Sequence, residues 1–90
     1  MIPPTIGRVV LVQREELQAQ RQPAFVTYVH SERQINVAGF DNEGRHFAEN
    51  EIQLLQDDDV PANADRFAEW MPYQKQQAAT ALQIPERTQL

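Results

Sequence analysis

The feature that most constrains this chain is a succession of short segments rich in β-branched and aromatic residues. Three of them stand out: residues 6–12 (I-G-R-V-V-L-V), 24–30 (A-F-V-T-Y-V-H) and 35–40 (I-N-V-A-G-F). Such runs favour β-strands, because branched and ring side chains pack well on a pleated surface. Their short length and close spacing predict an all-β domain, built as a small five-stranded barrel or a half-open sheet.

Turn-forming and polar residues separate these segments. D-N-E-G at residues 41–44 is typical of a tight turn closed by a left-handed residue, a conformation that glycine adopts without a Cβ penalty. A fourth strand is predicted to begin at residues 45–47, and residues 50–56 continue or follow it. Residues 13–22 are polar and predict a long exposed loop, which Pro23 ends.

The length of 90 residues, 41% of them apolar, predicts one domain with a single core. We assign residues 1–73 to the barrel domain. Residues 74–90 form a polar C-terminal tail, which is either flexible or helical. The predicted core combines aliphatic and aromatic side chains: Val9, Leu11, Val26, Tyr28, Ile35, Val37, Phe47, Ile52, Leu54 and Trp70.

Composition excludes several classes of function. The chain has no cysteine, which excludes disulfides, thiolate zinc sites and cysteine nucleophiles. Its net charge of −5 disfavours general binding to nucleic acids, because the phosphate backbone is also anionic. No segment approaches the roughly 20 apolar residues of a membrane span. We therefore expect a protein that stays in the cytoplasm, with no membrane partner.

Several strings of the sequence resemble a widespread group of small proteins encoded by tailed bacteriophages. The strings are P-P-T-I-G-R-V-V at 3–10, Q-P-A-F-V-T-Y-V-H at 22–30, I-N-V-A-G-F-D-N-E-G at 35–44 and A-E-W-M-P-Y-Q-K at 68–75. The most specific part is E-W-M-P-Y-Q. The resemblance implies an SH3-like barrel, a phage origin and a non-enzymatic accessory role. It transfers no site residues, and the loop at 13–22 is shorter than the insertion that many relatives carry there.

Catalytic and metal-binding patterns are weak. His30, Ser31 and Asp41 are residue types of a hydrolase triad, but no G-x-S-x-G element or comparable oxyanion turn accompanies them. Neither His30 nor His46 has a partner at the spacing typical of zinc ligands, and the aspartates at 57–59 lack the pattern of a calcium loop. We therefore predict no catalytic residue, no metal site and no cofactor, and interpret 57–59 as a solvated acidic loop.

Two groups of residues are candidates for binding. Tyr28, Phe67, Trp70 and Tyr73 are aromatic, and in SH3-like domains such residues line grooves for proline-rich peptides or stack on bases. The alternative is that Trp70 closes one end of the barrel and that Tyr73 is the exposed member. The second group consists of the arginines Arg8, Arg33, Arg45 and Arg66. They converge on a phosphate if the fold brings them together, and are otherwise scattered surface charges.

Three functions remain open at this point. The leading hypothesis is a phage accessory protein that binds a host protein stoichiometrically in the host cytoplasm and counters a host defence. The second is a homo-oligomeric sponge that sequesters a signalling nucleotide, with arginines on the phosphates and Tyr73 or Phe67 on the base. The third is a minor virion or assembly component. An open strand edge or aromatic face would favour a homo-oligomer.

Overall fold

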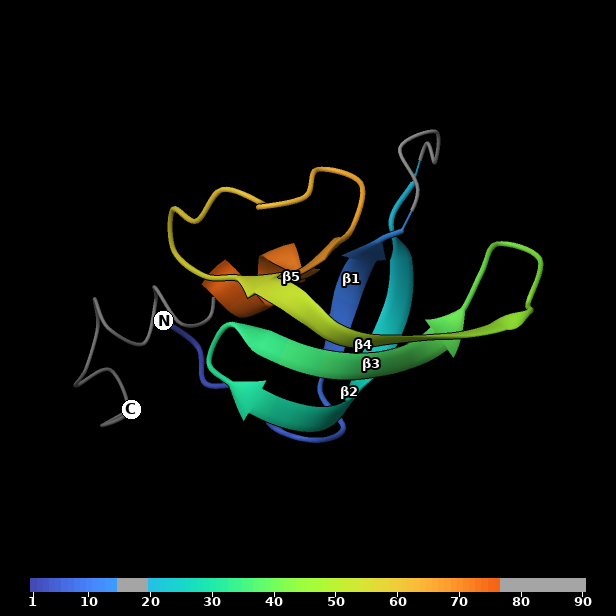
Figure 1. Ribbon diagram of the computed structural model, residues 1–90, viewed down its shortest axis with the longest axis horizontal. Coiled ribbons are helices and arrows are strands. Elements are labelled where there is room, and N and C mark those ends of the chain that lie inside the picture. The colour runs from blue at the N-terminus through green and yellow to red at the C-terminus, as the bar shows by residue number, and fades with distance from the viewer. Residues whose placement is uncertain (15–19, 77–90) are drawn as a thin grey trace, which may run out of the picture.

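The structure is a computed structural model that describes residues 1–14 and 20–76. Within these residues the chain forms five strands: β1 (Val9–Gln13), β2 (Gln22–Ser31), β3 (Gln34–Phe40), β4 (His46–Leu55) and β5 (Phe67–Trp70). The strands close into a barrel in the order β1-β2-β3-β4-β5 (Figure 1). Residues 72–76 form a short helical turn after β5. The predicted all-β, five-stranded barrel is therefore confirmed, whereas its assignment to the SH3-like barrels stays a prediction.

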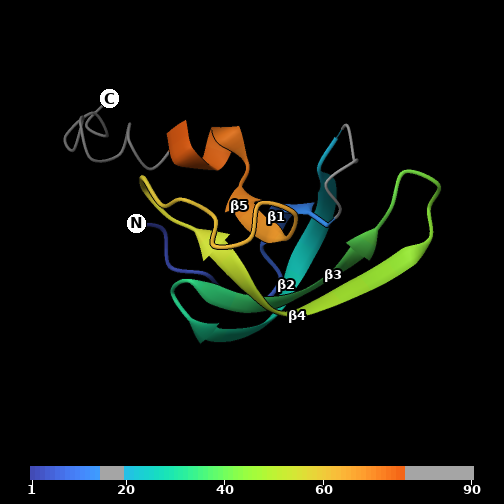
Figure 2. The same ribbon diagram turned by 45° about the horizontal axis from the view of Figure 1, so that its top comes forward.

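Closure of the barrel depends on β5. It pairs antiparallel with β1, from Val10 opposite Trp70 to Gln13 opposite Phe67. On its other side it pairs parallel with β4 through two residue pairs only, Leu54–Ala68 and Leu55–Glu69. The remaining neighbours, β1–β2, β2–β3 and β3–β4, are antiparallel. The hairpin that joins β3 to β4 extends away from the barrel to one side (Figure 2).

The tip of that hairpin has the predicted turn. Gly44 has a φ of 83° and its N–H donates to the carbonyl of Asp41 at 3.0 Å. The Asp41 carboxylate also accepts the N–H groups of Glu43 at 2.9 Å and Arg45 at 2.8 Å. A side chain that bonds the following backbone in this way is a common device of tight turns. The turn at residues 41–44 is confirmed.

The core is formed by aliphatic residues from all five strands together with two larger aromatic ones. Its members are Val10, Val12, Ala24, Val26, Ile35, Val37, Phe47, Ile52, Leu54, Ala68 and Trp70. The prediction of Val9 and Leu11 as core residues was wrong. Val9 is 39% exposed and Leu11 is half-buried, whereas Val10 and Val12 are fully buried. Because side chains alternate between the two faces of a strand, an error of one residue exchanges the inward and outward side chains of the whole strand.

Tyr28 was also predicted to lie in the core, and it lies outside, 55% exposed. Val26 is fully buried, and a residue two positions later on a regular strand would share its face. However, the pairing with β3 shifts between Val26 and Tyr28, so that Thr27 is an extra residue in β2. Such a β-bulge reverses the alternation of faces. The bulge therefore turns Tyr28 outward.

Several predicted boundaries also move. The first strand begins at Val9 rather than at residue 6, because Gly7 has a φ of 96° and the Arg8 N–H closes a turn on Thr5 at 3.2 Å. Pro23 lies within β2 rather than ending the loop, and the fourth strand is continuous. Half of the predicted 13–22 loop, at residues 15–19, and the tail beyond residue 76 lie outside the described residues.

Neither stretch that the structure describes contains a helix with the length and apolar character that a membrane span requires.

Candidate functional site

A row of apolar residues crosses the outside of the barrel on four neighbouring strands. Val9 on β1 is the register partner of Phe25 on β2, Phe25 of Ala38 on β3, and Ala38 of Ala48 on β4. Direct partners on adjacent strands have their side chains on the same face of the sheet. The four side chains therefore form one continuous strip on the outer surface.

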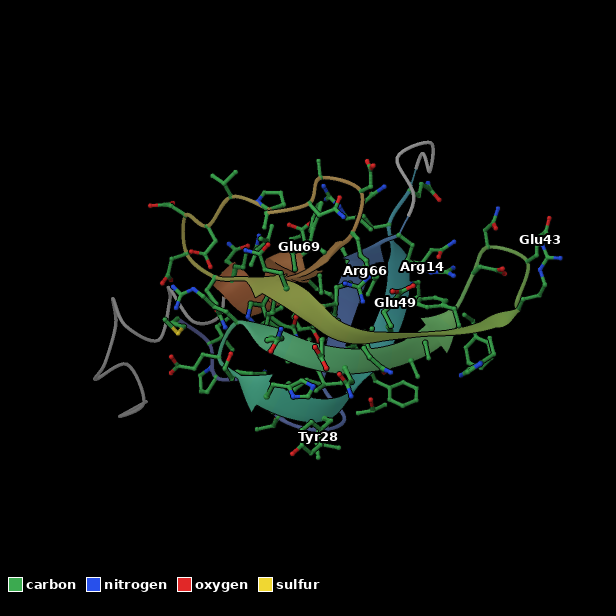
Figure 3. The ribbon with its side chains drawn as sticks, viewed as in Figure 1. Arg14, Tyr28, Glu43, Glu49, Arg66 and Glu69 are labelled. Atoms are coloured by element: carbon green, nitrogen blue, oxygen red, sulfur yellow. The ribbon has the colours of Figure 1, made fainter. Side chains whose placement is uncertain are left out.

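Two more aromatic residues extend this strip along the strands. Phe40 follows Ala38 by two residues on β3 and is 53% exposed, and Phe25 is 45% exposed. Tyr28 lies further along β2; Figure 3 shows it on the side of the sheet away from Glu49, where it projects into solvent. We call the set of Val9, Phe25, Tyr28, Ala38, Phe40 and Ala48 the outward face.

Histidine rings flank the aromatic members of the outward face. The ring of His30 lies edge-on to Tyr28 with centroids 4.9 Å apart, and the ring of His46 lies edge-on to Phe40 at 6.1 Å. His30 Nε2 is also 2.8 Å from Oδ1 of Asn36, the register partner of Tyr28. The aromatic side chains are thus held by ring contacts along the sheet.

Charge is excluded from this part of the surface. The pairing of β4 with β3 shifts between Glu49 and Ile52. The outward positions of β1, β2, β3 and the part of β4 before this shift carry no Lys, Arg, Asp or Glu. Charged residues make up 23% of the chain, so the rest of the surface carries them. An exposed apolar area of this kind in a small protein is typical of a surface that contacts another protein.

The predicted aromatic group does not assemble into a groove. Trp70 is 2% exposed and Phe67 is buried, so both belong to the interior. Tyr28 and Tyr73 are exposed, but Tyr73 follows β5 in the short helical turn while Tyr28 lies on the outer surface of β2. The alternative in which Trp70 closes one end of the barrel and Tyr73 is exposed agrees with these positions.

The predicted arginines do not converge either. Arg33 lies in the turn before β3 and its Nε is 2.8 Å from Oδ2 of Asp59. Arg45 lies beyond the other end of β3, where it pairs with Asp41 at 3.4 Å and with Glu43. Arg8 precedes β1, and its guanidinium is 5.9 Å from the centre of the Trp70 ring. Arg33 and Arg45 are therefore neutralised by carboxylates at opposite ends of one strand.

The fourth candidate, Arg66, belongs to a further set of charges at one mouth of the barrel, together with Arg14 and Glu49, which the sequence analysis did not single out. Glu49 Oε1 is 2.7 Å from Arg66 Nε, and its Oε2 is 3.4 Å from Arg14 Nε; Figure 3 shows the three side chains turned toward one another. The Arg14 guanidinium also lies 4.2 Å from the centre of the Phe47 ring. This cluster covers the core residue Phe47, so we assign it to stability.

The acidic run at 57–59 is less solvated than predicted, because Asp59 is part of the framework. Its Oδ2 accepts from Arg33 and, at 2.9 Å, from the N–H of Gln56. The hydrogen bond from Arg33 lowers the pKa of Asp59, and the Gln56 N–H adds to this effect. The N–H of Arg45 lowers the pKa of Asp41 in the same way. Both carboxylates hold turns together.

A hollow of about 540 Å³ lies beside this loop and is lined by Ile2, Leu55, Trp70, Asp58 and Lys75, among others. Its acidic groups are largely engaged: Glu69 pairs with Arg21 and, at 3.6 Å, with Lys75. Asp57 is 3.2 Å from the terminal amino group of Met1. With these groups paired, the part of the hollow that residues 1–14 and 20–76 form does not present the convergent polar groups that orient a small ligand.

The three triad candidates do not come together, because Asp41 lies at the other end of β3 from His30 and Ser31. Ser31 Oγ accepts the N–H of Arg33 at 3.2 Å, while Asp41 lies beyond the far end of β3. Among residues 1–14 and 20–76, no three acidic or histidine side chains are placed to share a metal ion.

The structure is thus a small closed β-barrel whose outward face is apolar and uncharged. Comparison with protein-family models, with curated proteins and with solved structures found no match to this chain.

The members of the outward face other than Tyr28 were missed as site residues. Phe25 and Phe40 contribute to strand patterns in the sequence, but whether a strand residue points inward depends on register. A usable signal was the absence of charge at every second position of residues 9–13 and 34–40. On a strand whose outer face contacts only water, the outward positions would normally carry charged or polar side chains.

Proposed function

We propose that this protein is a non-catalytic binding module that docks a partner protein on its outward face. The single observation that carries the proposal is the outward strip from Val9 through Phe25 and the half-buried Ala38 to Ala48, which carries no charge. Aromatic residues are enriched and charged residues depleted at the centres of protein interfaces. Phe25, Tyr28 and Phe40 supply the aromatic anchors of such a centre.

A protein partner fits this surface better than a nucleotide or a nucleic acid does. Aromatic rings can stack on bases, but a nucleic-acid site also needs cations along the path of the phosphates. The outward face has none, and the net charge of the chain is −5. Two of the four arginines proposed for phosphate binding, Arg33 and Arg45, are already paired with carboxylates.

The resemblance to tailed-bacteriophage proteins adds a cellular setting to this proposal. It points to an accessory protein that acts in the cytoplasm of an infected bacterium. A small module without reaction chemistry acts by occupying its target, so its effect is stoichiometric. A host defence factor is the target that we propose, with the outward face as the surface that blocks it.

The test compares two variants that carry the same change at different places. Phe25→Asp places a charge in the centre of the outward face, and Val60→Asp places it in the loop before β5, at a residue that is 79% exposed. Tagged wild-type and variant proteins are used to capture proteins from a bacterial host lysate, and titration calorimetry then measures the stoichiometry. We expect a partner that is retained by wild type and Val60→Asp and lost with Phe25→Asp. Equal capture by all three proteins would reject the outward face as the docking surface.

The two other functions make different predictions. A nucleotide sponge would show a rise of melting temperature with micromolar cyclic nucleotides, since a ligand at 100 times its dissociation constant stabilises by about 2.7 kcal/mol. A virion component would be found in purified particles by mass spectrometry. Under the function proposed here, neither result is expected.

A further inference from the structure

We infer that, when no partner protein is bound, two copies of this chain pack against each other through their outward faces. The inference rests on the proposed function, because it concerns the same surface. It adds that a second copy of the chain covers the outward face when no partner protein is bound.

The first step is the amount of apolar surface that water would otherwise contact. Phe25, Tyr28 and Phe40 are 45%, 55% and 53% exposed. At roughly 200 Å² for a whole aromatic side chain, the three rings alone present about 300 Å². Val9 and the two alanines enlarge this area. An area of about 300 Å² matches the largest apolar patch on a typical monomer, and such patches are often functional.

The second step is the chemistry of the surface that can cover it. Any partner that brings a charge onto the outward face must desolvate that charge without a counterion, because the face offers none. A second copy brings only the same uncharged residues. In a two-fold arrangement, Phe25 and Phe40 of each copy contact apolar groups of the other copy. Burying the two faces then breaks no ion pair in either copy.

The third step is the position of two of the thirteen acidic residues of the chain. Glu43 is paired with Arg45 at the tip of the β3–β4 hairpin, and Glu69 is paired with Arg21 and Lys75 next to β1. Figure 3 shows both glutamates well away from Tyr28. Two outward faces can therefore meet while these carboxylates stay at the rim or beyond it.

The fourth step is the strength of the association. A stable interface of standard size buries about 800 Å² on each partner, and smaller ones are transient. With about 300 Å² of aromatic surface as its centre, the outward face belongs to the weaker class. We therefore expect a dimer that dissociates in the micromolar range, which a tighter-binding partner protein can replace.

The experiment is sedimentation velocity at protein concentrations from about 1 to 500 μM. Wild type is compared with Phe25→Asp, with Phe40→Asp as a second change on the face, and with Val60→Asp as the control. Wild type and Val60→Asp should shift from monomer to dimer over this range. Each face variant should raise the dissociation constant at least about a hundredfold, because both copies of the dimer lose an anchor and gain a buried charge. Thermal melting of each variant shows that it is folded.

The outcomes separate this inference from the proposed function. A wild-type protein that remains monomeric at 500 μM overturns the inference, and so does a dimer that both face variants leave intact. If wild type is monomeric but Phe25→Asp still loses its captured partner, the proposed function stands without the dimer. If the dimer forms through the face but capture does not depend on Phe25, the dimer stands and the proposed function falls.

Discussion

Trp70 Nε1 donates a hydrogen bond to Oε1 of Gln56 at 3.1 Å, and both side chains are buried at one end of the barrel. The same Gln56 oxygen accepts the N–H of Ile2 at 3.1 Å. Its Nε2 donates to the carbonyls of Ile2 at 2.7 Å and Glu32 at 2.9 Å. A single amide thus uses all four of its hydrogen-bonding positions to join the N-terminal segment, the β2–β3 turn and β5.

Replacing this amide tests its importance. Gln56→Leu leaves the indole N–H of Trp70 and two backbone groups of Ile2 without partners in a buried place, and each such group costs about 1–3 kcal/mol. We expect the free energy of unfolding to fall by about 3 kcal/mol, measured by urea denaturation with the fluorescence of Trp70, the only tryptophan of the chain. Gln34→Leu, at an exposed position of β3, is the control and should change it little. If Gln56→Leu lowered the free energy of unfolding as little as Gln34→Leu does, the role assigned to the amide would be contradicted.

The register of β1 makes a sharper prediction. Val9→Asp and Val10→Asp introduce the same charge at adjacent residues, but Val10 is fully buried whereas Val9 is exposed. A buried carboxylate without a partner costs several kcal/mol, so Val10→Asp should unfold the domain at room temperature. Val9→Asp should keep a cooperative melting transition by circular dichroism. The opposite result would place Val9 and Leu11 inside, as the sequence pattern predicted.

That error shows which part of the fold the sequence could not determine. Residues 9–12 are V-V-L-V, so apolar side chains occur at both odd and even positions. The pattern predicts a strand but not which face is inward, because that depends on pairing with β2 and β5. Where polar and apolar residues alternate, as at 34–38, the buried positions Ile35 and Val37 were predicted correctly.

The candidate site was predicted less well than the fold, for a related physical reason. Trp70 is a large aromatic residue, and such residues serve equally as binding groups and as core, so composition alone did not separate the two. Tyr28 was on the candidate list, but its outward position depends on the bulge at Thr27. A bulge leaves no reliable mark in a single sequence. Phe25 and Phe40 became visible as a surface only once four strands were placed side by side.

Gly39 provides a test of close packing between β2 and β3. A Cβ at this residue would lie 2.2 Å from the carbonyl oxygen of Pro23 and 2.8 Å from Cα of Ala24. Because backbone atoms cannot yield as a flexible side chain does, Gly39→Ala should destabilise the fold by about 3 kcal/mol. Gly44→Ala is the comparison: its Cβ meets open space, but the φ of 83° should cost about 1 kcal/mol. Equal losses in chemical denaturation would show that the contact between the strands is looser than described.

The ion pair between Asp59 and Arg33 predicts how stability depends on acid. The pKa of Asp59 is lowered in the folded protein, so near pH 4 the unfolded chain binds more protons at this residue than the folded chain does. The stabilisation is therefore complete above the ordinary aspartate pKa of about 3.8, and it is lost as the pH falls through the lowered value. Asp59→Asn removes the titrating group, while its amide oxygen can still accept the N–H of Gln56.

We expect wild type to lose stability between about pH 5 and pH 2 more steeply than Asp59→Asn does, as measured by thermal melting at each pH. Asp58→Asn removes the same charge from the exposed neighbouring side chain and should follow the wild-type curve. The variant Arg33→Gln should resemble Asp59→Asn, because the hydrogen bond from the guanidinium is the main cause of the lowered pKa. Three variants that all keep the wild-type slope would mean that this ion pair does not contribute to the acid sensitivity of the barrel.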